Sequence, residues 1–207
     1  MSGHILTGFG FGPIQSGLFV AEGYKSSNFD RIVIAEIDDR LVKAVRDAGG
    51  KYFVNVAKND GIEVQQIEGI EIYNPKVEQD LEKIKDALAE STEIVTSLPS
   101  VDFYDMGQNS IAELIAGALD ASPDISTLVY TAENNNHAAE ILEDKVKEKA
   151  EKKIKNNRVQ FLNTVIGKMS QVINDADQIK KLNIKPMAEG VNRAFLVEQF
   201  NRILVTK

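Results

Sequence analysis

The stretch that decides the fold is "GHILTGFGFGPIQSGLF", residues 3–19. In it a short apolar run breaks into glycines at Gly8, Gly10 and Gly12, and a helix-like pattern follows. A pyrophosphate binds where backbone N–H groups meet the positive end of a helix, and glycine permits its close approach. The stretch therefore has the layout of a phosphate-binding turn, with a plain glycine-rich turn as the alternative.

Two registers of the turn are open, one starting at Gly8 and one at Gly10. The second lets a helix begin near Ile14 and places Pro13 in its first turn, where the missing N–H costs least. We therefore favour the register from Gly10. Neither register is the standard three-glycine fingerprint, and in the register from Gly10 it is Gln15 that stands where the third glycine would fall.

Short β-rich runs alternate with helical patterns along the rest of the chain. The runs are mostly apolar with little alternation, which is typical of strands buried on both faces of a parallel sheet. They cover residues 4–9, 31–36, 51–57, 93–98, 126–132 and 158–162. Helical periodicity covers residues 75–89, 109–119 and 134–155. This order predicts an α/β fold with a Rossmann-like, doubly wound, mostly parallel sheet.

Two segments depart from the alternation. Residues 61–75 read as two short strands around Glu68-Gly69, which predicts a β-hairpin inserted after the third strand. Residues 190–207 read as one or two extended segments. The sequence shows no internal repeat or linker, so we expect a single domain over residues 1–207.

The second predicted strand ends in an acidic cluster at Glu36, Asp38 and Asp39. A carboxylate at this position accepts hydrogen bonds from ribose hydroxyls and repels a 2′-phosphate, which favours NAD over NADP. Arg40 is the nearby cation that would favour a 2′-phosphate. Asp38 or Asp39 also suits a helix cap, so Glu36 is the candidate ribose ligand.

Composition limits the class of protein. The net charge of −7 argues against a general nucleic-acid binder. The absence of cysteine excludes disulfides and thiolate metal sites and suits the cytoplasm, while His4 and His137 have no metal-ligand spacing. No apolar run reaches the roughly 20 residues that span a bilayer. We expect a cytoplasmic protein without nucleic-acid, membrane or metal partners.

Six segments, in order, resemble the N-terminal domain of the long-chain polyol dehydrogenases, the group that includes mannitol-1-phosphate 5-dehydrogenase and mannitol 2-dehydrogenase. They are "FGFGPIQSGLF" (9–19), "IVIAEID" (32–38), "EIVTSLPS" (93–100), "YTAENNNHAAEIL" (130–142), "VQFLNTVIGKMSQVI" (159–173) and "FLVEQFNRILVTK" (195–207). The resemblance implies an NAD-dependent dehydrogenase that moves hydride between nicotinamide and a polyol or polyol phosphate.

The resemblance also implies site residues. The cofactor group is Gly10, Gly12, Pro13, Ile14, Glu36, Thr96, Ser97, Glu133 and Asn134. The substrate group is Asn163, Thr164 and Lys168. Asn134 would in addition help to polarise the reacting oxygen. Read from the residues alone, Thr96 and Ser97 are strand-end hydrogen-bonding residues, and Asn134 is a helix N-cap.

Two departures from the family pattern matter. Its "VDR" is replaced by residues 166–168, "IGK", so an acidic group is lost and the arginine becomes Lys168, without the bidentate fork. The family's catalytic lysine, asparagine and histidine lie in a helical C-terminal domain outside this sequence. Hydride transfer from an alcohol needs a general base, and His137 is the one histidine near the fifth strand.

The expected function is therefore the cofactor-binding domain of such a dehydrogenase, inactive alone. Its missing partner would be the C-terminal domain or, across the apolar surface left open, a second copy. A complete, non-catalytic nucleotide-binding or interaction domain is the alternative. A methyltransferase that binds S-adenosylmethionine is a third hypothesis, since a glycine loop and an acidic strand end also suit that ligand.

Overall fold

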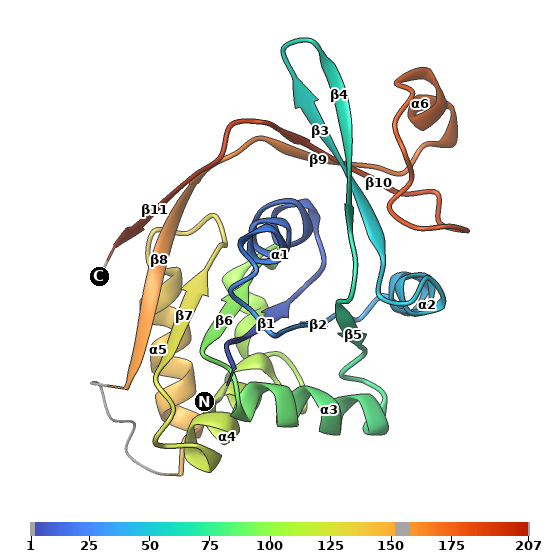
Figure 1. The fold of residues 1–207 in the computed structure, drawn as a ribbon. Coiled ribbons are helices and arrows are strands. Elements are labelled where there is room, and N and C mark those ends of the chain that lie inside the picture. The colour runs from blue at the N-terminus through green and yellow to red at the C-terminus, as the bar shows by residue number, and fades with distance from the viewer. Residues whose placement is uncertain (1–2, 152–157, 207) are drawn as a thin grey trace.

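The computed structural model describes residues 3–151 and 158–206, which form two β-sheets with helices around them (Figure 1). The larger sheet has seven strands in the order β11-β8-β7-β6-β1-β2-β5. Their bounds are β1 Ile5–Phe9, β2 Arg31–Ala35, β5 Glu71–Tyr73, β6 Glu93–Thr96, β7 Thr127–Thr131, β8 Val159–Gly167 and β11 Arg202–Thr206. Neighbouring strands are parallel except β11 against β8, so the predicted mostly parallel α/β sheet is confirmed.

Helices lie on both faces of this sheet (Figure 1). One face carries a helix that starts at Pro13, widens into a π-helical turn, η1 (Gln15–Val20), and continues as α1 (Ala21–Ser26). The same face carries α2 (Asp39–Asp47). The opposite face is covered by α3 (Glu78–Ala89), α4 (Ile111–Ala121) and α5 (Ala138–Lys149), with a short 3-10 helix, η2 (Val101–Asp105). Two separate apolar cores result, one on each face.

A second sheet covers the first helix. Its order is β4-β3-β10-β9, with bounds β3 Tyr52–Lys58, β4 Gly61–Ile67, β9 Ser170–Ile173 and β10 Ala194–Glu198, and α6 (Ala176–Lys181) follows β9. A Cβ on Gly17 of the helix would lie 2.7 Å from Val197 of β10, and the Tyr52 hydroxyl donates to the Ser16 carbonyl at 2.7 Å. The helix is therefore packed between the two sheets.

The expected strand pairing around residues 61–75 is wrong. A β-hairpin is present, but its strands are β3 and β4, whereas β5 pairs in parallel with β2 of the large sheet. Gly69, with φ +74°, turns the chain between the sheets rather than closing a hairpin. Ile67 and Ile72, on either side of this turn, are both buried in the same core. The strand at 51–57 accordingly lies in the second sheet.

The third long helix is shorter than its periodicity indicates. It was expected over residues 134–155, and α5 spans Ala138–Lys149 because Asn135 forms a loop whose side chain accepts from the His137 N–H. The expectation for residues 152–155 lies outside the described residues. The extended segments expected within 190–207 are β10 and β11.

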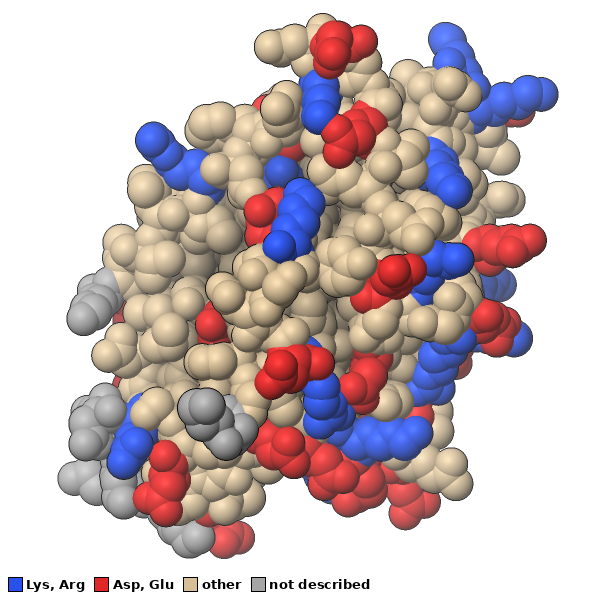
Figure 2. Space-filling view, viewed as in Figure 1, with Lys and Arg blue, Asp and Glu red and all other residues tan. Residues whose placement is uncertain are grey.

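The described helices include none that is long and apolar enough to cross a membrane. Figure 2 shows Lys and Arg interspersed with Asp and Glu over one face of the molecule.

Candidate dinucleotide-binding site

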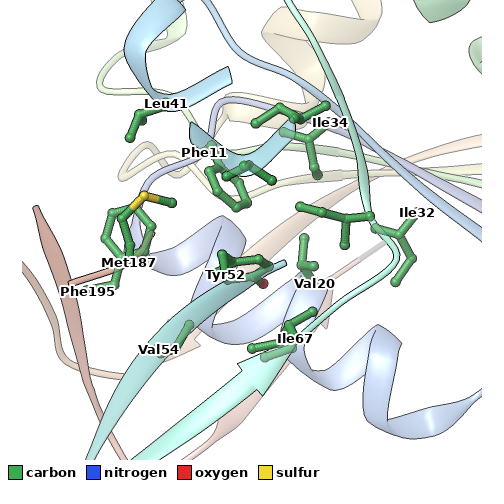
Figure 3. Packing of buried hydrophobic residues seen from close by; sticks show 14 of the residues in the cluster. Phe11, Val20, Ile32, Ile34, Leu41, Tyr52, Val54, Ile67, Met187 and Phe195 are labelled. Atoms are coloured by element: carbon green, nitrogen blue, oxygen red, sulfur yellow. The ribbon is translucent and has the colours of Figure 1, made fainter. Parts of the chain in front are cut away.

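The glycine turn follows β1 and is fixed between its two neighbouring strands. Gly10 has φ +84°, and its N–H donates to the Ala35 carbonyl at 2.9 Å. A Cβ at Gly10 would lie 2.7 Å from the Ser97 carbonyl oxygen, so both conformation and space require glycine there. Phe11 then points into the core, with ring centroids 4.9 Å from Tyr52 and 5.9 Å from Phe195 (Figure 3).

The start of the helix is open beside this turn. A Cβ on Gly12 would meet no atom within 4 Å, in contrast to one on Gly10. The helix begins at Pro13, and the Ser16 N–H donates to the Gly12 carbonyl at 2.9 Å. The N–H groups of Ile14 and Gln15 precede any acceptor within the helix, so this end carries free donors and a positive dipole. Such an end favours an anion.

Gln15, in the place of the fingerprint's third glycine, lies over Gly8. A Cβ on Gly8 would be 1.8 Å from the Gln15 Nε2, so a glycine in β1 provides the room that the helix does not. Gln15 is fully buried, and neither of its amide atoms has a hydrogen-bond partner within the described part of the chain. Gly8 lies inside β1, which agrees with a turn that starts at Gly10.

Glu36 follows β2 and faces the glycine turn. Its Oε2 accepts the Phe11 N–H at 2.7 Å, and its Oε1 accepts the Asp38 N–H at 2.8 Å. Each oxygen keeps a lone pair for a further donor. Asp38 caps α2 by accepting the Arg40 N–H at 3.0 Å, and it also pairs with Arg193 at 3.2 Å. The predicted aspartate cap of the helix is confirmed at Asp38, whereas Glu36 takes no part in the cap.

The strand ends of β6 and β7 meet in a buried polar cluster. Glu133 is 4% exposed and accepts hydrogen bonds from the Thr96 hydroxyl at 2.9 Å, the Leu98 N–H at 2.9 Å and the Tyr104 hydroxyl. Burial raises the pKa of Glu133, and these hydrogen bonds oppose that rise. Burial and the neighbouring carboxylate raise the pKa of Tyr104. Thr96 and Glu133 thus hold the two loops together with side chains directed into the protein.

Sequence reasoning missed Tyr104. Its position in a short 3-10 helix has no periodic pattern, and no spacing connects it to Glu133, 29 residues further along the chain. The loop after β6 is held beside the glycine turn by a hydrogen bond between backbone groups. The Ser97 N–H donates to the Phe9 carbonyl at 3.0 Å, which fixes the loop after β6 beside the glycine turn.

Asn134 and Asn163 lie near the start of α5. Asn134 is exposed and is not the N-cap, which is His137. The Asn163 side chain instead accepts the Ala139 N–H at 2.9 Å and donates to Glu140 at 2.7 Å. The residue-based alternative for Asn134 is therefore wrong, because a residue from the next strand supplies the cap.

The other two predicted substrate residues lie in different surroundings. The Thr164 hydroxyl donates to the Thr131 carbonyl at 2.7 Å, so it stays beside the end of β7. Lys168 donates to the Glu198 carbonyl at 2.8 Å, between the two sheets, and burial lowers its pKa. The structure thus brings the glycine turn, Glu36 and the β6 and β7 strand ends to one sheet edge and leaves Lys168 apart.

His137 is exposed, with its Nδ1 3.8 Å from a Glu140 oxygen. Within residues 3–151 and 158–206, no three histidine, cysteine, aspartate or glutamate side chains converge as a metal site.

Solved structures show where this fold occurs. No family model and no curated protein matches the sequence. The chain superposes on a D-sorbitol dehydrogenase in substrate-free form with a TM-score of 0.76, 13% identity and 97% of this chain covered. It superposes on Pseudomonas fluorescens mannitol 2-dehydrogenase, solved with NAD and D-mannitol, with a TM-score of 0.77, 11% identity and 100% of this chain covered.

The chain spans about half the length of these two structures, 49% and 50%. At such low identity the similarity defines the fold alone, which is a Rossmann-like α/β fold. Ligands of open α/β sheets bind at the carboxyl ends of the strands, where the glycine turn and Glu36 lie.

Proposed function

We propose that this chain is the NAD-binding domain of a polyol dehydrogenase-like oxidoreductase. The observation that carries the proposal is the placement of the Glu36 carboxylate, within hydrogen-bond distance of the Phe11 N–H, beside an open helix start at Gly12. A dinucleotide needs this combination, with donors for its pyrophosphate and a carboxylate for its adenosine ribose. The proposed substrate is a sugar alcohol or its phosphate, such as mannitol 1-phosphate.

Each group has a defined part in this proposal. Gly12 and the N–H groups of Ile14 and Gln15 hold the pyrophosphate, and Glu36 accepts the ribose hydroxyls. NAD is preferred over NADP because a 2′-phosphate would meet the Glu36 carboxylate. Bound NAD supplies the hydride acceptor. Ser97 and Asn134 then lie on the nicotinamide side, with Asn134 donating to the reacting oxygen.

The general base comes from outside the described residues. A base must lie within hydrogen-bond distance of the substrate hydroxyl, and the buried Glu133 already accepts three protein donors. A further helical domain, or a second subunit, is the proposed source. The chain alone therefore binds the dinucleotide without turning over a polyol.

A titration of NADH followed by its fluorescence tests the binding. The informative variant is Gly12→Ala, since the added methyl group meets no protein atom but enters the space assigned to the pyrophosphate. We expect about tenfold weaker NADH binding, the size of effect expected when one charge-assisted hydrogen bond is lost. The matched control is Gly117→Ala on α4, where a Cβ also meets nothing within 4 Å.

Unchanged folding in both variants, checked by thermal denaturation, ties any loss to the site. Equal NADH affinity for Gly12→Ala and the unmodified chain would contradict the placement of the pyrophosphate. Absence of binding at millimolar NADH would contradict the proposal as a whole. S-adenosylmethionine is titrated in parallel, because tighter binding of that ligand would favour the methyltransferase hypothesis.

A complete, non-catalytic nucleotide-binding domain is the second candidate. One observation favours it: Glu133, Asn163 and Lys168, to which the resemblance assigns cofactor or substrate contacts, are engaged by the protein itself. An absorbance assay of the intact native protein with NAD, D-mannitol and mannitol 1-phosphate separates the two. NADH production supports the dehydrogenase, and NADH binding without turnover supports the second candidate.

A further inference from the structure

A cavity of about 550 Å³ lies against the large sheet, away from the glycine turn. One wall is the first helix and the loop after it, and the floor is formed by strands β6, β7 and β11. The residues that matter here are Phe19, Glu22, Phe29, Glu93, Tyr130 and Val205. Gly10, Gly12 and Glu36 do not line it, so it is a separate site. Its volume is within the range of small-molecule pockets.

The cavity exists because one face of β7 is only partly covered. Along this strand Val129 is fully buried beneath the α3–α5 layer, whereas Leu128 and Tyr130, which point to the other face, stay partly exposed. Interior strands of a parallel sheet are normally covered on both faces. The first helix leaves open a strip of this face, which is lined by residues of β1, β6, β7 and β11.

The cavity contains the carboxylate of Glu93, with His4, which also lines the cavity, as a nearby ionisable neighbour. Glu93 is half-buried, and its side chain makes no hydrogen bond or ion pair with any residue in the described ranges. Burial raises the pKa of Glu93, and the nearby His4 opposes that rise only in part. The second lining carboxylate, Glu22, already has Lys25 at 3.0 Å. No lysine or arginine lines the cavity within the described part of the chain.

Two aromatic rings, those of Phe19 and Tyr130, line the same cavity as this carboxylate. The ring centroids of Phe19 and Tyr130 are 6.3 Å apart with the planes tilted by 40°. Glu93 lies close enough to Tyr130 to contribute to raising the pKa of its hydroxyl. Ring faces attract a cation and stack on a flat apolar group, while an unpaired half-buried carboxylate favours an ammonium group.

We propose that this cavity binds a small organic amine, with its aromatic or apolar body packed against the exposed sides of Phe19 and Tyr130 and its ammonium group on Glu93. The site is independent of the dinucleotide site and of its proposed function. It selects for a positive charge joined to a flat apolar group, because each part of the lining matches one part of such a ligand.

Tryptamine is the probe, because the protein has no tryptophan and the indole fluorescence of the ligand is free of background. The neutral isostere tryptophol is titrated in parallel by fluorescence anisotropy. We expect tryptamine to bind about tenfold more tightly than tryptophol, as for one charge-assisted hydrogen bond. The variant Glu93→Gln should lose this preference while keeping its affinity for tryptophol.

The matched control is Glu90→Gln, which removes the same charge from an exposed side chain outside the cavity and should leave the preference intact. Equal binding of the amine and the alcohol, or an unaltered preference in Glu93→Gln, would overturn the proposal. So would absence of tryptamine binding.

Two further results would also overturn it. Displacement of tryptamine by saturating NADH would place the amine in the dinucleotide site. A dimer in sedimentation that Val205→Glu dissociates would show that a second copy, rather than a small ligand, covers this face. Unchanged tryptamine affinity in the presence of NADH, with a monomer in sedimentation, supports the proposal.

Discussion

The backbone N–H of Phe11 donates to the side-chain carboxylate of Glu36 over 2.7 Å. This bond connects the glycine turn after β1 to the end of β2, 25 residues further along the chain. It holds the carboxylate in place before any ligand arrives, since the second oxygen is fixed by the Asp38 N–H. A dinucleotide would therefore meet a ribose acceptor that is already oriented.

The variant Glu36→Gln should bind NADH more weakly and discriminate less against NADPH. The amide lacks the charge that repels a 2′-phosphate, and its NH₂ group faces a backbone donor. We expect about a tenfold fall in the NADH-to-NADPH affinity ratio, comparable to one lost charge-assisted interaction. Fluorescence titrations of both cofactors measure it, with the exposed Glu68→Gln as the control. An unaltered ratio would remove Glu36 from the ribose site.

Replacement of Gly10 should destabilise the fold. In Gly10→Ala the methyl group approaches the Ser97 carbonyl and the residue is held at φ +84°, so we expect a loss of about 1–3 kcal/mol in the free energy of unfolding. Urea denaturation measures it. The matched variant Gly49→Ala has φ +67° with no atom within 4 Å of the added Cβ, and should lose less. Equal losses would show that the contact with Ser97 costs nothing.

The Tyr104→Phe variant should be destabilised in a pH-dependent way. Burial raises the pKa of Glu133, so the free energy of unfolding falls as pH rises through the range between its unfolded and folded pKa values. The Tyr104 hydroxyl opposes that rise, and its removal raises the pKa of Glu133 further. The loss should be about 1–3 kcal/mol near neutral pH and smaller once Glu133 is protonated in acid.

Urea denaturation of the Tyr104→Phe variant across acidic to neutral pH checks this dependence. The exposed Tyr24→Phe serves as the control, because it removes the same atom from a solvated site. A loss that is constant with pH would mean that the hydroxyl acts by packing and not through the carboxylate.

The variant Gln15→Met should stabilise the protein. Both amide atoms of Gln15 are buried without hydrogen-bond partners in the described structure. Methionine has a similar shape but buries no amide group. We expect a gain of about 1 kcal/mol in the free energy of unfolding, the lower end of the cost of an unsatisfied buried group. Urea denaturation beside the exposed Gln160→Met measures it. A loss of stability would indicate that the amide has a partner in solution.

The main sheet could be predicted from the sequence because its signals are local. Runs such as "RIVIAE" (31–36) are apolar, and several runs alternate with helical periods, which indicates both strands and crossovers. The different positions of Glu36 and Asp38 could be predicted from the sequence, because Glu36 follows a strand and Asp38 precedes a helix.

The second sheet could not be predicted in the same way. Its pairing of β3 with β10 is fixed by contacts such as the Asn55 side chain on the Phe195 carbonyl, 140 residues apart. Nothing near "KYFVNVA" (51–57) indicates that its partner is a distant strand. The role of Tyr104 could not be predicted for the same reason, because it consists of a hydrogen bond to Glu133, which is distant in the sequence.

The sequence departs from the glycine fingerprint at one position, because the room between a strand and a helix can be provided by a small residue in either element. The standard motif places the small residue in the helix, and here Gly8 in β1 provides the room for Gln15. The steric requirement is the same, but a motif that fixes the spacing of glycines does not detect a small residue in the other element.

The packing of Phe11 against Phe195 has a consequence for biosynthesis. The first residues of the site leave the ribosome early, but their backing strand, β10, lies far along the chain. Contacts across so much sequence are slow to form, so the glycine turn should gain its native shape only after β10 has been made. Until then Phe11 and the helix behind it present apolar surface to the cell, and a nascent chain stalled before residue 194 should be a substrate for chaperones rather than a ligand-binding intermediate.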